Sequence, residues 1–132
     1  MIILAVDLGT KRTGFAMSDP KESMALALPT LTDVTPVDVA ALADERRAEE
    51  IVVGLPLNMD GTVGPSAQRV LEFIDELKLH VVVPVVPWDE RLSTAEGQAR
   101  LRQAGLDRKD RHKRADVAAA IVILESYLRS RK

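Results

Sequence analysis

The sequence contains no cysteine, which excludes a disulfide framework and a zinc site built on thiolates. Aromatic residues make up only 3% of the chain, so the core must be built from aliphatic side chains. No segment approaches the roughly 20 consecutive apolar residues that a membrane-spanning helix needs. Because no basic flank precedes the apolar run at the N-terminus, we expect no signal peptide, no membrane association and a cytoplasmic location.

The length of 132 residues suits a single domain covering residues 1–132, and a hydrophobic content of 46% is ample for a buried core. The net charge of −2 argues against a nucleic-acid partner, but the charges are distributed unevenly. Residues 1–90 carry 7 basic and 15 acidic side chains, whereas residues 91–132 carry 11 basic and 5 acidic ones. The basic C-terminal part is either a polyanion-binding face or a solvated helical surface, and charge alone favours the second.

Five segments have the apolar pattern of β-strands: residues 2–6, 13–18, 24–28, 51–54 and 81–86. The continuous apolar run of the first predicts a central strand covered on both faces. The loop before the second is too short for a parallel crossover, so these two strands should form an antiparallel hairpin. Pro29 is expected to end the third strand, and Pro84 should move the last one to the edge of the sheet.

Helical patterns follow these strands. Thr35 and Pro36 are typical of a helix start, residues 66–77 are amphipathic, and Ser93 or Thr94 should cap a third helix. After a charged stretch at 107–114, residues 115–128 are apolar on nearly every side, which predicts a deeply buried last helix. The alternation of elements predicts a mixed α/β sheet with helices on its faces.

The first strand ends at Asp7, where a carboxylate directly follows buried residues. Such a group is costly to bury unless it is paired, protonated or bound to a metal. In the segment that follows, Thr10, Lys11 and Arg12 can contact phosphate oxygens. An ordinary hairpin turn would also contain aspartate and glycine. The position of Asp7 favours a functional site.

Two further polar clusters follow strands. The loop after residue 54 contains Asn58 and Asp60, which are equally compatible with a simple turn. Glu90 and Arg91 follow the last strand, and Glu90 is a candidate metal ligand. The alternative for Glu90 is that an acid at a helix start stabilises the helix dipole.

The last cluster lies on the apolar C-terminal helix. Asp116 shares its helical face with small alanines, so this face can lie close to the sheet. Compensation of the helix dipole is the alternative to a site there, and Lys113 stands three residues earlier. Carboxylates from separate segments, without cysteine or a convincing histidine, suit Mg²⁺ or Mn²⁺. A pair of such ions would activate water and stabilise the leaving oxygen in phosphodiester cleavage.

Four segments together resemble the YqgF/RuvX family: DLGTKRTG at 7–14, VGLPLNMDGT at 53–62, DERLST at 89–94 and ADVAAAIVILESYL at 115–128. The resemblance implies an RNase H-like fold with a five-stranded mixed sheet flanked by helices on both faces. It also implies a divalent-metal nuclease, described in the family as a Holliday junction resolvase or as a nuclease that processes the 5′ end of pre-16S rRNA. The implied metal ligands are Asp7, Glu90 and Asp116.

The resemblance also suggests how substrate is bound. The expected nucleic-acid contacts are Thr10, Lys11, Arg12, Asn58, Arg91 and Lys113. Asp60 or Asn58 could compete with Glu90, because many RNase H-like nucleases have their second acid at the end of the fourth strand. Resolution of a branched DNA would require two facing sites and hence a homodimer.

Two alternatives remain open at this point. One is a nucleic-acid-binding module that kept the fold and lost catalysis, because a fold does not guarantee an activity. The other is a nucleotide-binding module of the actin, Hsp70 and sugar-kinase type, whose first phosphate loop is similar to DLGTKRTG. Those proteins bind nucleotide between two domains, and 132 residues supply one.

Overall fold

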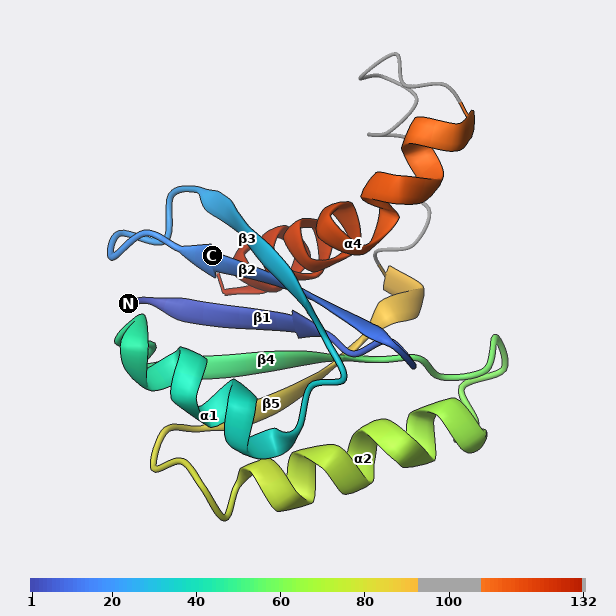
Figure 1. Ribbon diagram of the computed structural model, residues 1–132, viewed down its shortest axis with the longest axis horizontal. Helices are drawn as coiled ribbons and strands as arrows, with labels where there is room; N and C mark the ends of the chain where they lie inside the picture. Colours follow the sequence, from blue (N-terminus) through green and yellow to red (C-terminus); the bar gives the residue numbers. More distant parts are fainter. Residues whose placement is uncertain (93–107, 132) are drawn as a thin grey trace.

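A computed structural model of the chain describes residues 1–92 and 108–131, the side chains of residues 108–118 excepted. Five strands form one sheet in the order β3-β2-β1-β4-β5 (Figure 1). The strands are β1 (Ile3–Asp7), β2 (Arg12–Ser18), β3 (Ala25–Thr32), β4 (Glu50–Leu55) and β5 (Val85–Asp89). The helices are α1 (Pro36–Glu45), α2 (Pro65–Leu77), the short 3₁₀ helix η1 (Glu90–Leu92) and α4 (Arg108–Ser130). In the described part of the chain, no helix is long and apolar enough to cross a membrane.

The strand directions determine where functional groups can gather. The pair β1 and β2 is antiparallel, as the short loop predicted, whereas β1 with β4 and β4 with β5 are parallel. Parallel strands end on the same side of a sheet, so the C-terminal ends of β1, β4 and β5 lie together, and we call this side the carboxyl edge. The opposite side, where these strands begin, is the amino edge.

Alternating side chains divide the core into two layers. On one face Leu4, Val6 and Phe15 pack with α1 and α2, and on the other Ile3 and Ala5 pack under α4. This alternation follows from the two-residue period of a strand. A central strand with both faces covered is expected to be apolar, as β1 is from Ile3 to Val6. The prediction of a five-stranded mixed sheet with helices on both faces is confirmed.

Capping residues and apolar spacing in the sequence predicted the first two helices correctly. Thr35 caps α1 through a reciprocal capping box with Asp38, and Pro36 occupies the first helical turn. Helix α2 begins at Pro65 and buries Val70, Ile74 and Leu77, at the helical spacing seen in the sequence.

Two predicted strand boundaries were wrong. Strand β3 does not stop at Pro29 but continues to Thr32, because the register with β2 shifts there and the bulge takes up the proline. Residues 81–84 are not part of a strand, and β5 begins at Val85. The predicted place of β5 at the edge of the sheet is confirmed. An edge strand needs hydrogen bonds on one side only and therefore tolerates Pro87.

The last helix is longer than predicted. Residues 108–114, expected as a charged stretch outside it, are helical. Arginine and lysine are good helix formers, and the apolar pattern alone does not reveal a charged N-terminal extension of the helix. The indole of Trp88 on β5 donates a hydrogen bond to Ser126 at 3.2 Å and packs edge-on against Tyr127, which anchors α4 to the sheet. The helix predicted from Ser93 or Thr94 lies outside the described residues.

Candidate active site

Two carboxyl groups meet at the carboxyl edge. Asp7 is the last residue of β1, and Glu90 follows the last residue of β5. A hydrogen bond joins the two side chains. The strand between them, β4, carries Gly54 at this level, and a Cβ atom there would lie 2.8 Å from Oε1 of Glu90. The missing side chain of Gly54 therefore provides the space in which Glu90 reaches Asp7.

The pair is electrostatically unusual. Burial, the hydrogen bond that protonated Glu90 donates to Asp7, and the charges of Asp7 and Asp89 raise the pKa of Glu90 to about 8. Two carboxylates within hydrogen-bonding distance repel each other in a medium of low dielectric constant, so one of them keeps a proton near neutral pH. Two carboxyl groups in contact are candidate oxygen ligands for a cation.

Helix α4 passes directly over this pair. A Cβ atom on Gly54 would also lie 2.6 Å from Cδ1 of Ile123, so the helix contacts the sheet where the acids meet. Ala120 and Ile123 are buried on this face of α4. Asp116 precedes Ala120 by one turn, but its side chain, like that of Lys113, lies outside the described part of the structure. Their predicted roles therefore stay predictions. Within the described side chains, no group of three acidic, histidine or cysteine residues is arranged to hold a metal.

The loop after β4 uses its polar groups internally. Oδ1 of Asp60 accepts hydrogen bonds from the backbone N–H of Thr62 at 3.0 Å and from its hydroxyl at 2.6 Å, and these bonds lower the pKa of Asp60. The amide of Asn58 donates to the same hydroxyl at 2.9 Å. Both residues are exposed. The acid that contacts Asp7 is therefore Glu90, and neither Asp60 nor Asn58 replaces it there.

Arg91 connects β5 to this loop. Its guanidinium holds the carboxylate of Asp89 through Nε and Nη2, with Nη2 at 2.8 Å from Oδ2. Its Nη1 donates to the backbone carbonyl of Met59 at 3.1 Å. This ion pair keeps the pKa of Asp89 low and the segment around Glu90 in place. The sequence predicted a phosphate contact for Arg91 but not this contact with Asp89 and the loop after β4.

The hairpin after Asp7 forms an open groove. Gly9, Thr10, Lys11, Arg12 and Thr32 line a volume of about 490 Å³. A Cβ atom on Gly9 would lie 2.0 Å from the backbone carbonyl oxygen of Arg12, so only glycine permits this turn. Lys11 and Arg12 are exposed beside it. The three residues predicted to meet phosphate therefore lie together, next to the acid pair.

Arg69 stabilises the backbone of this groove through hydrogen bonds, and the sequence alone did not identify it. Its guanidinium on α2 donates to the carbonyls of Leu8 and Gly9, both at 3.4 Å. Nothing near Arg69 in the sequence distinguishes it from other exposed helix residues, because the contact spans 60 positions.

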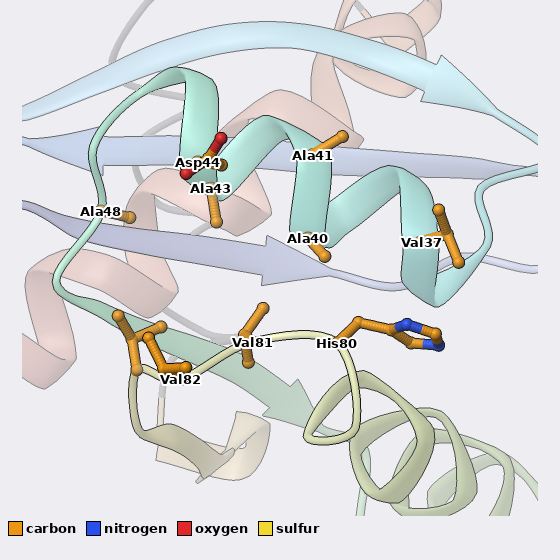
Figure 2. A pocket seen from close by; sticks show the side chains of 10 residues that line it. Val37, Ala40, Ala41, Ala43, Asp44, Ala48, His80, Val81 and Val82 are labelled. Carbon is orange, nitrogen blue, oxygen red and sulfur yellow. The ribbon is translucent and has the colours of Figure 1, made fainter.

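A second hollow, of about 470 Å³, lies at the amino edge between α1 and the segment that precedes β5 (Figure 2). Alanine and valine side chains form most of its wall, and Asp44 and His80 are its polar members. Figure 2 shows that these two side chains come from different elements, α1 and the loop after α2. The hollow lacks the convergent acids of the carboxyl edge, so we assign the candidate active site to that edge.

Solved structures identify the class of fold. The structure of the Fowlpox virus Holliday junction resolvase matches with a TM-score of 0.62 over 100% of both chains, at 16% identity. RuvC of Thermus thermophilus matches with a TM-score of 0.60 over 98% of this chain and 96% of its own, at 15% identity. The fold is therefore that of the RNase H-like resolvases, as expected.

The sequence profile of RuvX, described as a Holliday junction resolvase, matches residues 1–130, and the chain belongs to this family. A protein of Desulforudis audaxviator is 39% identical, over 100% of this chain and 96% of its own. One of Desulforamulus reducens is 42% identical, over 98% of both. Both carry the name "Putative pre-16S rRNA nuclease". The family membership favours a nuclease over the nucleotide-binding alternative.

Proposed function

We propose that residues 1–132 form one nuclease domain that cleaves phosphodiester bonds in structured nucleic acid with the help of a divalent cation. The observation that carries this proposal is the contact between Asp7 and Glu90. Two carboxyl groups that are brought together by different strands, over a glycine that makes room for them, have no use in packing the core. They fit a hard cation such as Mg²⁺ or Mn²⁺, which prefers oxygen ligands.

Asp7 and Glu90 would hold the cation, with Asp116 as the third ligand on α4. A bound cation of this kind activates a water molecule and stabilises the leaving oxygen of a phosphodiester. Glu90 must lose its proton before it can act as a ligand, and its raised pKa makes this loss coincide with cation binding. Without a cation, the proton on Glu90 keeps the two carboxyl groups from repelling each other.

The residues around the acid pair supply the contacts to the substrate backbone. Lys11 and Arg12, with Thr10, would bind phosphates in the groove beside Asp7. Asn58 and Arg91 would do so on the other side. Lys113 is proposed as a further contact on α4. Such contacts release counterions, so binding should weaken steeply as salt increases.

Structured RNA is the first candidate substrate. The relatives that match nearly the whole chain at 39% and 42% identity carry an rRNA nuclease name. Processing of the 5′ end of pre-16S rRNA would take place in the cytoplasm, the location expected from the sequence. Branched DNA is the second candidate, favoured by the description of the family profile. That activity would require a homodimer with two facing sites.

The decisive experiment is a panel of substrates incubated with the purified protein and Mg²⁺ or Mn²⁺. It includes a fragment of the rRNA precursor, a four-way DNA junction, a flap and single strands. We expect Asp7→Asn to fold normally, to bind the preferred substrate and to leave it uncleaved. Asp44→Asn, the same change at the amino edge, should cleave like the wild type.

Two results would contradict the proposal. Full activity of Asp7→Asn on the preferred substrate would remove Asp7 from the reaction. Salt-dependent binding by the wild-type protein without cleavage of any substrate would support a binding module that has lost catalysis.

A further inference from the structure

Met59 is an apolar residue in a position that polar residues normally occupy. Its side chain is 86% exposed. The N–H of Gly61 donates to the carbonyl of Asn58 at 2.8 Å, so residues 58–61 form a β-turn with Met59 at its first central position. The other turn residues, Asn58, Asp60 and Gly61, are of the types that turns prefer. Neither the turn nor the core accounts for a methionine here.

The loop that carries Met59, residues 56–64, is tied together by hydrogen bonds. The backbone N–H of Asn58 donates to the carbonyl of Thr62 at 2.9 Å, and the side chains of the same two residues are also bonded. Arg91 holds the carbonyl of Met59. A Cβ atom on Gly64 would lie 2.9 Å from Oδ1 of Asn58, so the loop closes tightly at its end as well. These contacts hold the backbone of Met59 in a defined place, from which its side chain extends into solvent.

This place is beside the acid pair, on the side opposite the hairpin groove. In the order of the strands, the groove of Lys11 and Arg12 lies next to β2 and β3, Asp7 is central, and loop 56–64 extends from β4 (Figure 1). A polynucleotide with a phosphate over the acids would thus meet positive charge on one side and Met59 on the other. An uncharged, polarisable thioether has little to offer a phosphate but packs well on the face of a base.

We infer, on the basis of the proposed function, that Met59 packs against the face of a base next to the scissile phosphate and selects sites where that base is unstacked. Such bases occur at branch points and at borders between single strand and duplex. Inside a continuous duplex every base face is covered by its neighbours. The free energy needed to unstack one base step is about as large as the free energy that a single side-chain contact contributes. Met59 is therefore a specificity residue, which favours open steps and disfavours continuous duplex.

The test uses 2-aminopurine, whose fluorescence rises when it is unstacked. The probes are an RNA hairpin with a single-stranded 5′ extension and a four-way DNA junction, each labelled at the border or branch. Binding is measured in the Asp7→Asn background, so that cleavage does not interfere. We expect the fluorescence to rise on binding, Met59→Ala to lose most of this rise, and Met59→Phe to keep it. Val82→Ala, which removes a fully exposed side chain at the amino edge, should behave like its parent.

Cleavage provides a second measurement, with Asp7 intact. Met59→Ala should cleave the better of the two probes about tenfold more slowly, in line with the loss of one base contact. On a probe whose border base is replaced by an abasic nucleotide, the wild-type protein and Met59→Ala should cleave at the same rate, since neither has a base to contact. A structural defect in the loop would leave Met59→Ala slower on this probe as well.

The two proposals fail separately. If the fluorescence rises as much with Met59→Ala as with its parent, Met59 has no role in unstacking the base. If Met59→Ala cleaves the abasic probe as slowly, relative to the wild type, as the intact probe, the role of Met59 is overturned as well. Either result leaves the nuclease intact. A rise that depends on Met59 in a protein that cleaves nothing would support the base contact and overturn the nuclease.

Discussion

Glu50 and Glu90 both lie between the sheet and α4, but at opposite edges and with opposite kinds of neighbours. At the amino edge, Glu50 begins β4 and is only 8% exposed. It accepts a hydrogen bond from the hydroxyl of Tyr127, and Nη1 of Arg131 lies 3.6 Å from it. At the carboxyl edge, Glu90 is hydrogen-bonded to a second carboxyl group, Asp7.

The difference separates a residue that stabilises the fold from one for which we propose a role in the reaction. A buried carboxylate with a donor and a cation beside it is compensated, and it fixes the end of α4 on the sheet. A carboxyl group placed against another raises the free energy of the folded protein until a proton or a cation is bound. Proteins accept such local conflicts mainly at functional sites. The following predictions test whether this contrast holds.

The largest effect should come from the same substitution at the two edges. Glu90→Gln removes a proposed cation ligand and should slow cleavage by about 10³-fold, since a bound cation contributes several kcal/mol to the transition state. Glu50→Gln should change the cleavage rate by less than about twofold while lowering the Tm. Rates with Mg²⁺ and melting curves of both variants provide the measurement. Equal losses of activity would erase the distinction between the edges.

Gly54→Ala should damage both activity and stability. Its methyl group would meet Oε1 of Glu90 and Cδ1 of Ile123, at 2.8 and 2.6 Å. Overpacking of this kind costs about 1–3 kcal/mol of unfolding free energy, and displacement of Glu90 should slow cleavage at least about tenfold. Ile123→Val removes the Cδ1 atom, so the double variant should regain stability in urea titrations without regaining cleavage. Recovery of both would mean that Glu90 had not been displaced.

Tyr127→Phe tests the amino edge alone. Loss of the hydroxyl leaves the buried Glu50 without one of its hydrogen-bond donors, at a cost of about 1–3 kcal/mol in the free energy of unfolding. Cleavage with saturating Mg²⁺ should be unaffected, because the acid pair lies at the other end of the sheet. A large loss of activity at a temperature where the variant is fully folded would show that the two edges are coupled.

The last effect is a pH dependence of stability in the absence of metal, which leaves cleavage untouched. The folded state raises the pKa of Glu90 to about 8, above its ordinary value near 4.5, so protonated Glu90 stabilises the fold at low pH. This contribution is complete below the ordinary pKa and is lost as pH rises through 8. In EDTA, the Tm of the wild-type protein should fall relative to that of Glu90→Gln between about pH 5 and pH 8.5. Glu50→Gln should keep the wild-type slope, and parallel curves for all three proteins would refute the assignment.

Much of this architecture could be predicted because its causes are local. Thr35, Pro36 and Asp38 specify the start of α1 among themselves. Pro29 misled the prediction of β3, because a proline, which lacks a backbone N–H, ends a strand only where a neighbouring strand needs that hydrogen bond. Whether it does depends on the register shift between β2 and β3 at Pro29, which involves another part of the chain.

By itself, the sequence determined the strand pattern, the burial of β1 and the presence of acids just beyond strand ends. These are consequences of side-chain period and polarity along one stretch of chain. Only the tertiary structure decided which acid stands beside Asp7. Asp60 and Glu90 both follow parallel strands, but the loop of Asp60 satisfies that carboxylate with Thr62. The pairing of β5 with β4 and the open space over Gly54 bring Glu90 to Asp7 instead. The physical reason is that contact between carboxyl groups depends on register and on free volume, which belong to the assembled sheet and not to any one segment.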